Sequence, residues 1–171
     1  RYELAGSVSV TEVNGIFRSG NQVTLTGEYL GRITSIDVSD VDGTTNKVTL
    51  ADGYGDVDFD VSDDGKSLTF NYPEAGQNNG TGKLVFYSGN VPVGEYTAVG
   101  LNVTEYGRYG NEIYLNGENL EGATVKLNDA PLNPSYDSGN GRLVIDHSKS
   151  GNEAARTYEG TFVVSTKHGY S

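Results

Sequence analysis

The side chains best suited to chemistry are a group of aspartates in the first half of the chain, at Asp56, Asp58, Asp60, Asp63 and Asp64. A hard cation such as Ca²⁺ prefers several carboxylate oxygens as ligands. The candidate Ca²⁺ ligands in this segment are Asp58, Asp60, Asp63 and Asp64.

Two observations weigh against a single ion in this segment. Asp56, Asp58 and Asp60 lie at alternate positions, so on a strand they share one face but spread over about 13 Å, at roughly 3.3 Å per residue. The sixth position of an EF-hand loop would be Val61, where that loop requires glycine. The alternative interpretation is a solvated strand face, with Phe59 and the neighbouring valines turned into a core. In a third hypothesis another loop completes a cation site next to Asp63 or Asp64, through Asp40 or Asp42.

Tyrosine is the second residue type that could bind a ligand, with 12 copies and no tryptophan in the chain. Sugar-binding sandwiches often stack their ligand on exposed aromatic rings, and a tyrosine ring can serve this purpose. The candidate carbohydrate-binding residues are Tyr106, Tyr109 and Tyr136, which lie in or beside predicted loops. The alternative interpretation for these rings is packing in strands or at a junction between domains.

No group of residues in the sequence forms a recognisable catalytic motif. Asp146, His147 and Ser148 have the residue types of a catalytic triad, but neighbours on a strand point to opposite faces and cannot form a relay. The chain has two histidines, no cysteine and no glycine-rich phosphate loop. We therefore predict that the protein is not an enzyme and has no catalytic residues.

The elements that must position these side chains are organised around a stretch that the chain contains twice. Gly20–Leu30 reads GNQVTLTGEYL and Gly110–Leu120 reads GNEIYLNGENL, with six identities in eleven positions. In the first copy Val23 and Leu25 alternate with threonines, which is the period of a strand buried on one face. The repeat therefore predicts two copies of the same β structure.

A second repeat precedes the first one. Tyr2–Val13 is echoed by Tyr96–Tyr106, which share Tyr, Gly and the tripeptide Val-Thr-Glu at an offset of 94 that falls to 93. Short β-rich runs separated by turns at roughly 8–12-residue spacing complete each copy, as in a β-sandwich. We therefore predict an all-β chain of two tandem immunoglobulin-like sandwiches, residues 1–92, with an extended middle region, and residues 93–171. Because the start of the chain reads like a junction between domains, we expect a longer array of such domains.

The net charge of −11 limits the expected partners. Phosphate backbones and anionic membrane surfaces both attract basic proteins, so neither nucleic acid nor a membrane surface is an expected partner. The sequence has no run of about 18 apolar residues that would predict a membrane-spanning helix. The lack of cysteine excludes disulfides and thiolate metal sites. A removed leader, or excision from a longer protein, would explain a chain that starts at Arg1 and has no methionine.

The second copy contains further landmarks in a fixed order. Val103–Glu105 comes first, then the repeated stretch Gly110–Leu120, then Thr124–Pro131, a strand followed by a turn with proline. A closing strand at Phe162–Thr166 is followed by Gly169. This order resembles the IPT/TIG family of immunoglobulin-like domains. Members of that family typically carry a glycine-rich turn, a strand of the type valine-threonine-isoleucine-x-glycine-x-asparagine-leucine, and a later small-residue turn with proline.

In the first copy the resemblance is clear over Asn21–Leu30 and weaker afterwards, because Ile33–Asp64 is longer than usual and the early turn lacks proline. The resemblance implies an immunoglobulin-like fold rather than an activity. Family members occur in transcription factors, receptor ectodomains, bacterial surface proteins and enzymes, and phage structural proteins. The acidic charge of this chain argues against the DNA-binding members.

Repetition, acidity and the lack of a catalytic motif together favour a non-enzymatic structural or adhesive module. We expect it on a virion (phage head or tail) or a bacterial cell surface, where it acts in assembly, decoration or attachment. Its expected partners are other subunits of a larger assembly or neighbouring immunoglobulin-like repeats. The alternative is a carbohydrate-binding or spacer module of a secreted enzyme or glycan receptor, with surface glycans as partners. A Ca²⁺-rigidified adhesin is a third hypothesis, and no other cofactor is expected.

Overall fold

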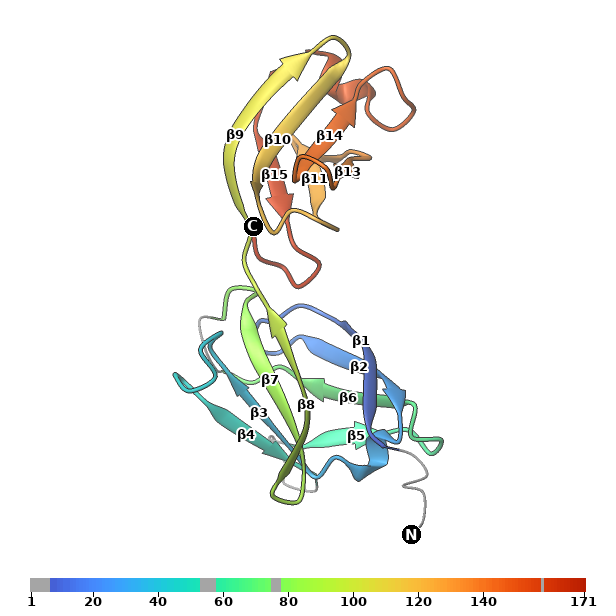
Figure 1. Ribbon diagram of the computed structural model, residues 1–171, viewed down its shortest axis with the longest axis vertical. Coiled ribbons are helices and arrows are strands. Elements are labelled where there is room, and N and C mark those ends of the chain that lie inside the picture. Colours follow the sequence, from blue (N-terminus) through green and yellow to red (C-terminus); the bar gives the residue numbers. More distant parts are fainter. Residues whose placement is uncertain (1–6, 53–57, 75–77, 158) are drawn as a thin grey trace. The chain divides into compact units, whose positions relative to one another are not determined.

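The computed structural model describes residues 7–52, 58–74, 78–157 and 159–171. Within these ranges the regular structure consists of antiparallel β-strands and short 3₁₀-helices, so the prediction of an all-β fold is confirmed (Figure 1). The chain divides into two compact units, Arg1–Val99 and Gly100–Ser171. Asp56, Val57 and the first half of the Tyr2–Val13 repeat lie outside the described residues.

The first unit consists of two four-stranded antiparallel sheets (Figure 1). One sheet has the order β1-β2-β6-β5 and the other has the order β4-β3-β7-β8. The short 3₁₀-helix η1 (Leu30–Arg32) follows β2. The strands are β1 (Ser9–Asn14), β2 (Gln22–Glu28), β3 (Ser35–Ser39), β4 (Val48–Ala51), β5 (Phe59–Val61), β6 (Ser67–Asn71), β7 (Gly82–Ser88) and β8 (Val91–Ala98).

The second unit has the same layout with one strand fewer among the described residues. Its sheets have the orders β13-β14-β10-β9 and β12-β11-β15. The strands are β9 (Asn102–Tyr109), β10 (Glu112–Glu118), β11 (Thr124–Leu127), β12 (Ala130–Pro131), β13 (Ser135–Asp137), β14 (Arg142–Asp146) and β15 (Phe162–Ser165). Before β15 lies the 3₁₀-helix η3 (Glu153–Thr157), whose Ala155 is buried in the core.

The boundary between the units differs from the predicted one. Sequence reasoning places it after residue 92. In the structure residues 92 and 93 lie within β8, and β8 pairs with β7 over its whole length. Hydrogen bonding to β7 therefore keeps β8 in the first unit, and the division falls between Val99 and Gly100.

Alternation of buried and exposed residues directs the apolar side chains of each unit between its sheets. In β2 Val23 and Leu25 are buried, and in β10 Ile113 and Leu115 are buried. Burying one large apolar side chain contributes roughly 1.5–3 kcal/mol, so each unit has a substantial core of its own. Further members are Phe17, Tyr72, Leu84 and Phe86 in the first core and Leu127, Leu143 and Ile145 in the second.

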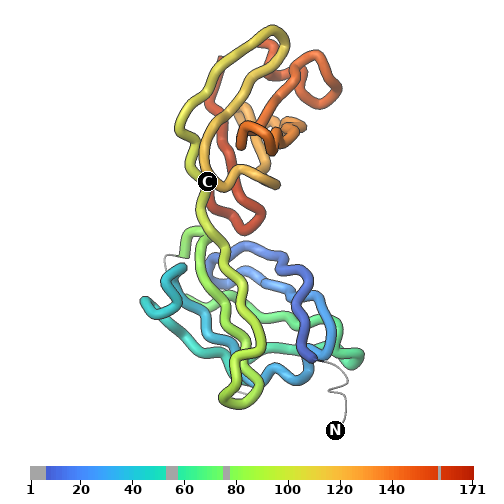
Figure 2. Tube along the Cα trace, in the orientation of Figure 1, coloured from blue at the N-terminus to red at the C-terminus, as the bar shows by residue number. Residues whose placement is uncertain are grey.

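The two copies of the repeated stretch form the same β structure. β2 and β10 each lie second in their sheet, and the order β1-β2-β6-β5 of the first unit matches β9-β10-β14-β13 of the second. Tyr29 and Asn119, at equivalent positions of the two copies, both have a positive φ, 58° and 59°. In the second unit β9 and β10 form a tight hairpin, drawn in yellow in Figure 2.

The repeated Val-Thr-Glu tripeptides form equivalent β-bulges. Thr11 is the extra residue of β1 against β2, and Thr104 is the extra residue of β9 against β10. The Thr11 hydroxyl donates to the carbonyl oxygen of Thr26 at 3.0 Å, and the Thr104 hydroxyl donates to that of Asn116 at 3.3 Å. The tripeptide is therefore repeated because the threonine closes the bulge.

A glycine lies opposite each bulge because the neighbouring backbone comes too close for a side chain. A Cβ added at Gly27 would overlap the carbonyl oxygen of Ser9, and one added at Gly117 would overlap that of Asn102. Neither glycine has a positive φ, so the requirement comes from space and not from backbone conformation.

Among the described residues no helix has both the length and the hydrophobicity of a membrane-spanning segment.

We expect Gly27→Ala to lower the free energy of unfolding of the first unit by about 1–3 kcal/mol, because backbone atoms would have to move apart. Urea denaturation followed by circular dichroism measures the change. Gly31→Ala is the matched control, since a Cβ there meets only Val61 Cγ1 at 4.0 Å. An equal effect of the two substitutions would contradict this explanation of the glycine.

Candidate functional site

The aspartates proposed as Ca²⁺ ligands lie on and after β5. Phe59 is buried while Asp60 next to it is exposed, as expected for a solvated strand face. Asp58 Oδ1 accepts a hydrogen bond from the Phe59 backbone N–H at 2.7 Å. Asp64 accepts from the Ser62 hydroxyl at 2.6 Å and from the Lys66 N–H at 3.0 Å, and these bonds lower the pKa of its carboxyl. Asp64 therefore stabilises a turn.

No group of three or more Asp, Glu, His or Cys side chains comes together as a metal-binding cluster anywhere in the described ranges. The four aspartates predicted as Ca²⁺ ligands all belong to the described residues: Asp58, Asp60, Asp63 and Asp64. The structure thus assembles no coordinating cluster from the predicted Ca²⁺ ligands.

The other loop considered for a cation site has two different aspartates. Asp42 accepts from the Thr45 hydroxyl and from the Thr44 and Thr45 N–H groups, and these bonds lower its pKa to about 2. Asp40 is buried, and its Oδ2 accepts from Asn46 Nδ2 at 3.2 Å. Both carboxylates are therefore used within the β3–β4 turn.

Tyr72 is a buried titratable group close to this turn. Its hydroxyl and Asp40 Oδ1 are both buried without a hydrogen-bond partner. Burial, with a smaller contribution from the negative charge of Asp40, raises the pKa of Tyr72 to about 12. Gly82 leaves the space for the hydroxyl, and the ring stacks on Phe17 with centroids 5.0 Å apart. The Tyr72 side chain is embedded in the first core.

The triad-like residues do not form a relay. Asp146 Oδ1 accepts from both the N–H and the hydroxyl of Ser148, at 3.0 and 2.6 Å, which lowers the pKa of its carboxyl. The backbone carbonyl of His147 accepts from Arg156 Nε at 2.8 Å. The bonds between Asp146 and Ser148 stabilise the turn that follows β14.

The three candidate tyrosines do not share one surface. Tyr106 lies opposite Leu115 in the β9–β10 ladder, so it is on the inner side of the sheet. Tyr109 lies opposite the exposed Glu112 and is on the outer side. Tyr136, in β13, is at the other edge of the sheet. They cannot stack on one ligand together, because register and strand order separate them.

The outer side of this sheet has a small hollow beside Tyr109, which is 80% exposed. It has a volume of about 220 Å³ and is lined by Tyr109, Glu112, Tyr114, Arg142 and Val144. The Arg142 guanidinium lies 4.9 Å from the centre of the Tyr114 ring and pairs with Asp137 at 3.3 Å. The Tyr114 hydroxyl lies over Gly107, where a Cβ would overlap it.

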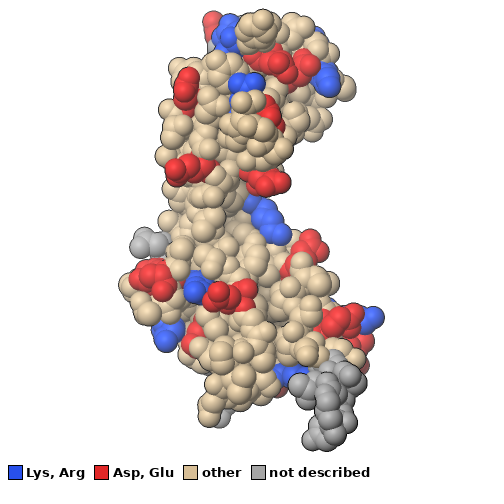
Figure 3. Space-filling view, viewed as in Figure 1, with Lys and Arg blue, Asp and Glu red and all other residues tan. Residues whose placement is uncertain are grey.

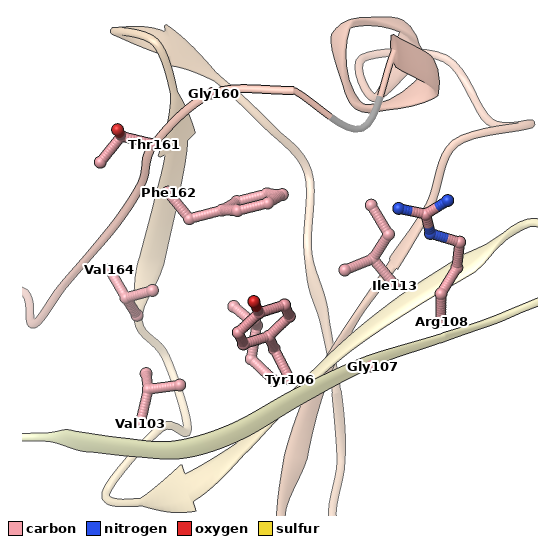
Figure 4. A pocket seen from close by; sticks show the side chains of 10 residues that line it. Val103, Tyr106, Gly107, Arg108, Ile113, Gly160, Thr161, Phe162 and Val164 are labelled. Atoms are coloured by element: carbon pink, nitrogen blue, oxygen red, sulfur yellow. The ribbon is translucent and has the colours of Figure 1, made fainter.

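A larger hollow lies on the inner side, between β9 and β15, with a volume of about 720 Å³. We call it the edge groove, because β9 and β15 are each the last strand of their sheet among the described strands. Tyr106, which is 78% exposed, and Phe162 contribute rings to it, and Figure 4 shows them on its two sides. Its principal lining side chains are Val103, Tyr106, Arg108, Ile113, Phe162 and Val164.

Sequence reasoning identifies Tyr106 but not the rest of the edge groove. Phe162 and Val164 have the alternation of an ordinary core strand, so nothing in their pattern predicts that one side of β15 is open. After β15 the residues from Thr166 to Tyr170 form a turn, in which the Thr166 N–H donates to the Tyr170 carbonyl and the Gly169 N–H donates to the Thr166 carbonyl.

Comparisons with known proteins assign no function to these sites. No family model matches the chain. No curated protein matches it either. Among solved structures the chain is similar to SGBP-B from a complex xyloglucan utilization locus in Bacteroides uniformis, with a TM-score of 0.45 and 14% identity. That match covers 95% of this chain but 47% of the other, so the chain spans about half of its length.

The raised pKa of Tyr72 predicts a pH dependence of stability. The neutral hydroxyl is favoured in the folded state, so its contribution is fully present below pH 10 and is lost as pH rises through about 12. A shift of this size corresponds to about 2–3 kcal/mol at most. We expect Tyr72→Phe to abolish the part of the loss of stability at high pH that comes from this hydroxyl. Urea denaturation between about pH 9 and 12 measures the free energy of unfolding.

Tyr109→Phe is the control, because it removes an exposed hydroxyl by the same substitution. The Tyr109→Phe variant should lose as much stability at high pH as the unmodified protein. If Tyr72→Phe and the unmodified protein lost stability in parallel, the assignment of the pH dependence to Tyr72 would be wrong.

Proposed function

We propose that the chain is a non-enzymatic structural and adhesive module, displayed outside the cell on a bacterial surface or a virion, which holds a protein partner at the edge groove. The observation that carries the proposal is the apolar surface left open there. Tyr106 is 78% exposed and Val103 is 36% exposed, although both lie on the inner side of a sheet. Exposed apolar surface around a hollow is typical of interaction sites.

The chemistry of the groove suits a protein partner. Its walls are mainly aromatic and aliphatic side chains, with one guanidinium from Arg108. Tyrosine and arginine are enriched among residues that contribute most to protein–protein binding. On the face shown in Figure 3, acidic and basic side chains are scattered among uncharged ones.

Membership of the IPT/TIG family is part of this proposal. It is supported by the structural requirements at three residues of the motif. Gly117 leaves space for the Asn102 carbonyl, Asn119 has a positive φ of 59°, and Leu120 is buried in the second core. A spacer or adhesive role fits a unit with its own core, because such a unit can be repeated along a chain.

A photo-crosslinking residue at position 106 tests the proposal on intact cells or particles that carry the chain. We expect Tyr106→benzoylphenylalanine to cross-link to another protein subunit of the assembly. The same substitution at Tyr29, an exposed tyrosine of the first unit, is the control and should not. Equal yields at both positions, or unchanged attachment and assembly after deletion of the chain, would contradict the proposal.

A second candidate function is carbohydrate binding on the outer side of the β9–β10 hairpin. The observation that favours it is the exposed ring of Tyr109 beside the hollow formed with Tyr114 and Arg142. An exposed ring next to hydrogen-bonding groups is what a sugar needs for stacking and recognition.

Glycan-array binding of the whole chain tests this second function. Tyr109→Ala should weaken binding at least tenfold, which corresponds to about 1.4 kcal/mol. Tyr136→Ala is the control, because Tyr136 lies at the opposite edge of the sheet and does not line the hollow. Absence of binding to every glycan, or an equal loss in both variants, would exclude the second function.

A further inference from the structure

The geometry points to a binding site for one buried water molecule in the first unit, between the hydroxyl of Tyr72 and the carboxylate of Asp40. The water accepts a hydrogen bond from the Tyr72 hydroxyl and donates one to Asp40 Oδ1. It thereby anchors the β3–β4 turn to the residue that follows β6. The site does not depend on either of the binding functions proposed above.

Both groups are buried polar groups that need a partner. Tyr72 is 1% exposed and Asp40 is 8% exposed. The Tyr72 hydroxyl and Asp40 Oδ1 receive no hydrogen bond from the part of the chain that the structure describes, whereas Asp40 Oδ2 accepts from Asn46 Nδ2 at 3.2 Å. An unpaired polar atom in a protein interior costs free energy, so two such atoms in one place indicate a ligand.

Gly82 brings the two groups together. A Cβ added at Gly82 would overlap the Tyr72 hydroxyl and lie 3.0 Å from the carbonyl oxygen of Ser39. Ser39 lies opposite Lys83 at the end of the β3–β7 ladder, so Asp40 comes next to Gly82. The negative charge of Asp40 also contributes to the raised pKa of Tyr72, as expected for a carboxylate close to the hydroxyl.

The second unit has an equivalent glycine. The sheet order β4-β3-β7 of the first unit matches β12-β11-β15 of the second. The first residue of β3 pairs with Tyr87 of β7, and the first residue of β11 pairs with Ser165 of β15. Gly82 and Gly160 each come five positions before these partners, so they are equivalent by register.

At the glycine of the second unit the polar side chain has its partners. A Cβ added at Gly160 would overlap the side chain of Asn128. Asn128 Nδ2 donates to the Glu159 carbonyl oxygen at 3.3 Å, and Asn128 Oδ1 accepts from the Thr161 N–H at 3.0 Å. This amide donates and accepts at once. In the first unit a hydroxyl and a carboxylate meet at the equivalent place, and a water completes the same pattern because it also donates and accepts.

The surrounding groups suit a water better than a cation. A buried water makes about three hydrogen bonds. Tyr72 supplies a donor, Asp40 supplies an acceptor, and the Ser39 carbonyl oxygen lies beside them. A cation such as Ca²⁺ takes about 6–8 oxygen ligands, and in the described ranges no three acidic, histidine or cysteine side chains gather as a metal cluster.

A high-resolution crystal structure of the whole chain tests the site. We expect one peak of electron density about 2.7–3.0 Å from both Tyr72 Oη and Asp40 Oδ1. Direct contact between these two oxygens would overturn the inference. A peak with the ligand distances of a cation such as Ca²⁺, about 2.3–2.6 Å, would overturn it as well.

A matched pair of variants shows whether Tyr72 holds the water. Crystals of Tyr72→Phe should lose the peak, because the donor is gone. Tyr87→Phe is the control and should keep it, because Tyr87 lies opposite Ser35, at the other end of the β3–β7 ladder. A peak that persists unchanged in Tyr72→Phe, or that disappears in both variants, would contradict the site.

A double-mutant cycle tests the same link in solution. We expect Tyr72→Phe and Asp40→Asn to be coupled at least about fivefold in the unfolding equilibrium constant, measured by urea denaturation at neutral pH. In the control cycle, Tyr87→Phe and Asp40→Asn should be additive to within about twofold. Additive effects of Tyr72→Phe and Asp40→Asn would mean that no water joins the two groups.

Discussion

Each unit depends on covering the apolar inner faces of two short-stranded sheets. Alternation along every strand sends one set of side chains inward, so these side chains must be covered by the opposing sheet or by a further strand. In the first unit β8 provides this cover on β7, and Leu84 and Phe86 are fully buried as a result. In the second unit the equivalent edge is β15, and no described strand covers it.

This one difference turns a structural edge into the candidate site. The side chains of the edge groove are not of unusual types, since leucine, valine, isoleucine and phenylalanine form most of the two cores. Their position distinguishes them, because the same inner-facing register that buries Val13 leaves Tyr106 in solvent. The strand order therefore explains why the groove is open, and the groove is apolar because its side chains are of the types that form the core.

Several aspartate carboxylates stabilise turns, whereas their number in the sequence suggests cation binding. Asp42, Asp64 and Asp146 each accept hydrogen bonds from a nearby hydroxyl and from backbone N–H groups of the same turn. Such side chain to backbone bonds stabilise turns, and they occupy the lone pairs that a cation would need. These three aspartates thus stabilise turns that connect short strands.

The sequence by itself determined the repeat, the all-β class and the strands β2 and β10, because alternation and glycine placement are local properties of the chain. It also gave Tyr106 as a candidate residue for carbohydrate binding, which stays a prediction. Only the tertiary structure decided that Tyr106 and Tyr109 face opposite sides of one sheet and that β8 belongs to the first unit. Register and edge coverage depend on pairing between distant segments, for example β7 with β3 and β15 with β11, and no local pattern encodes which edge remains open.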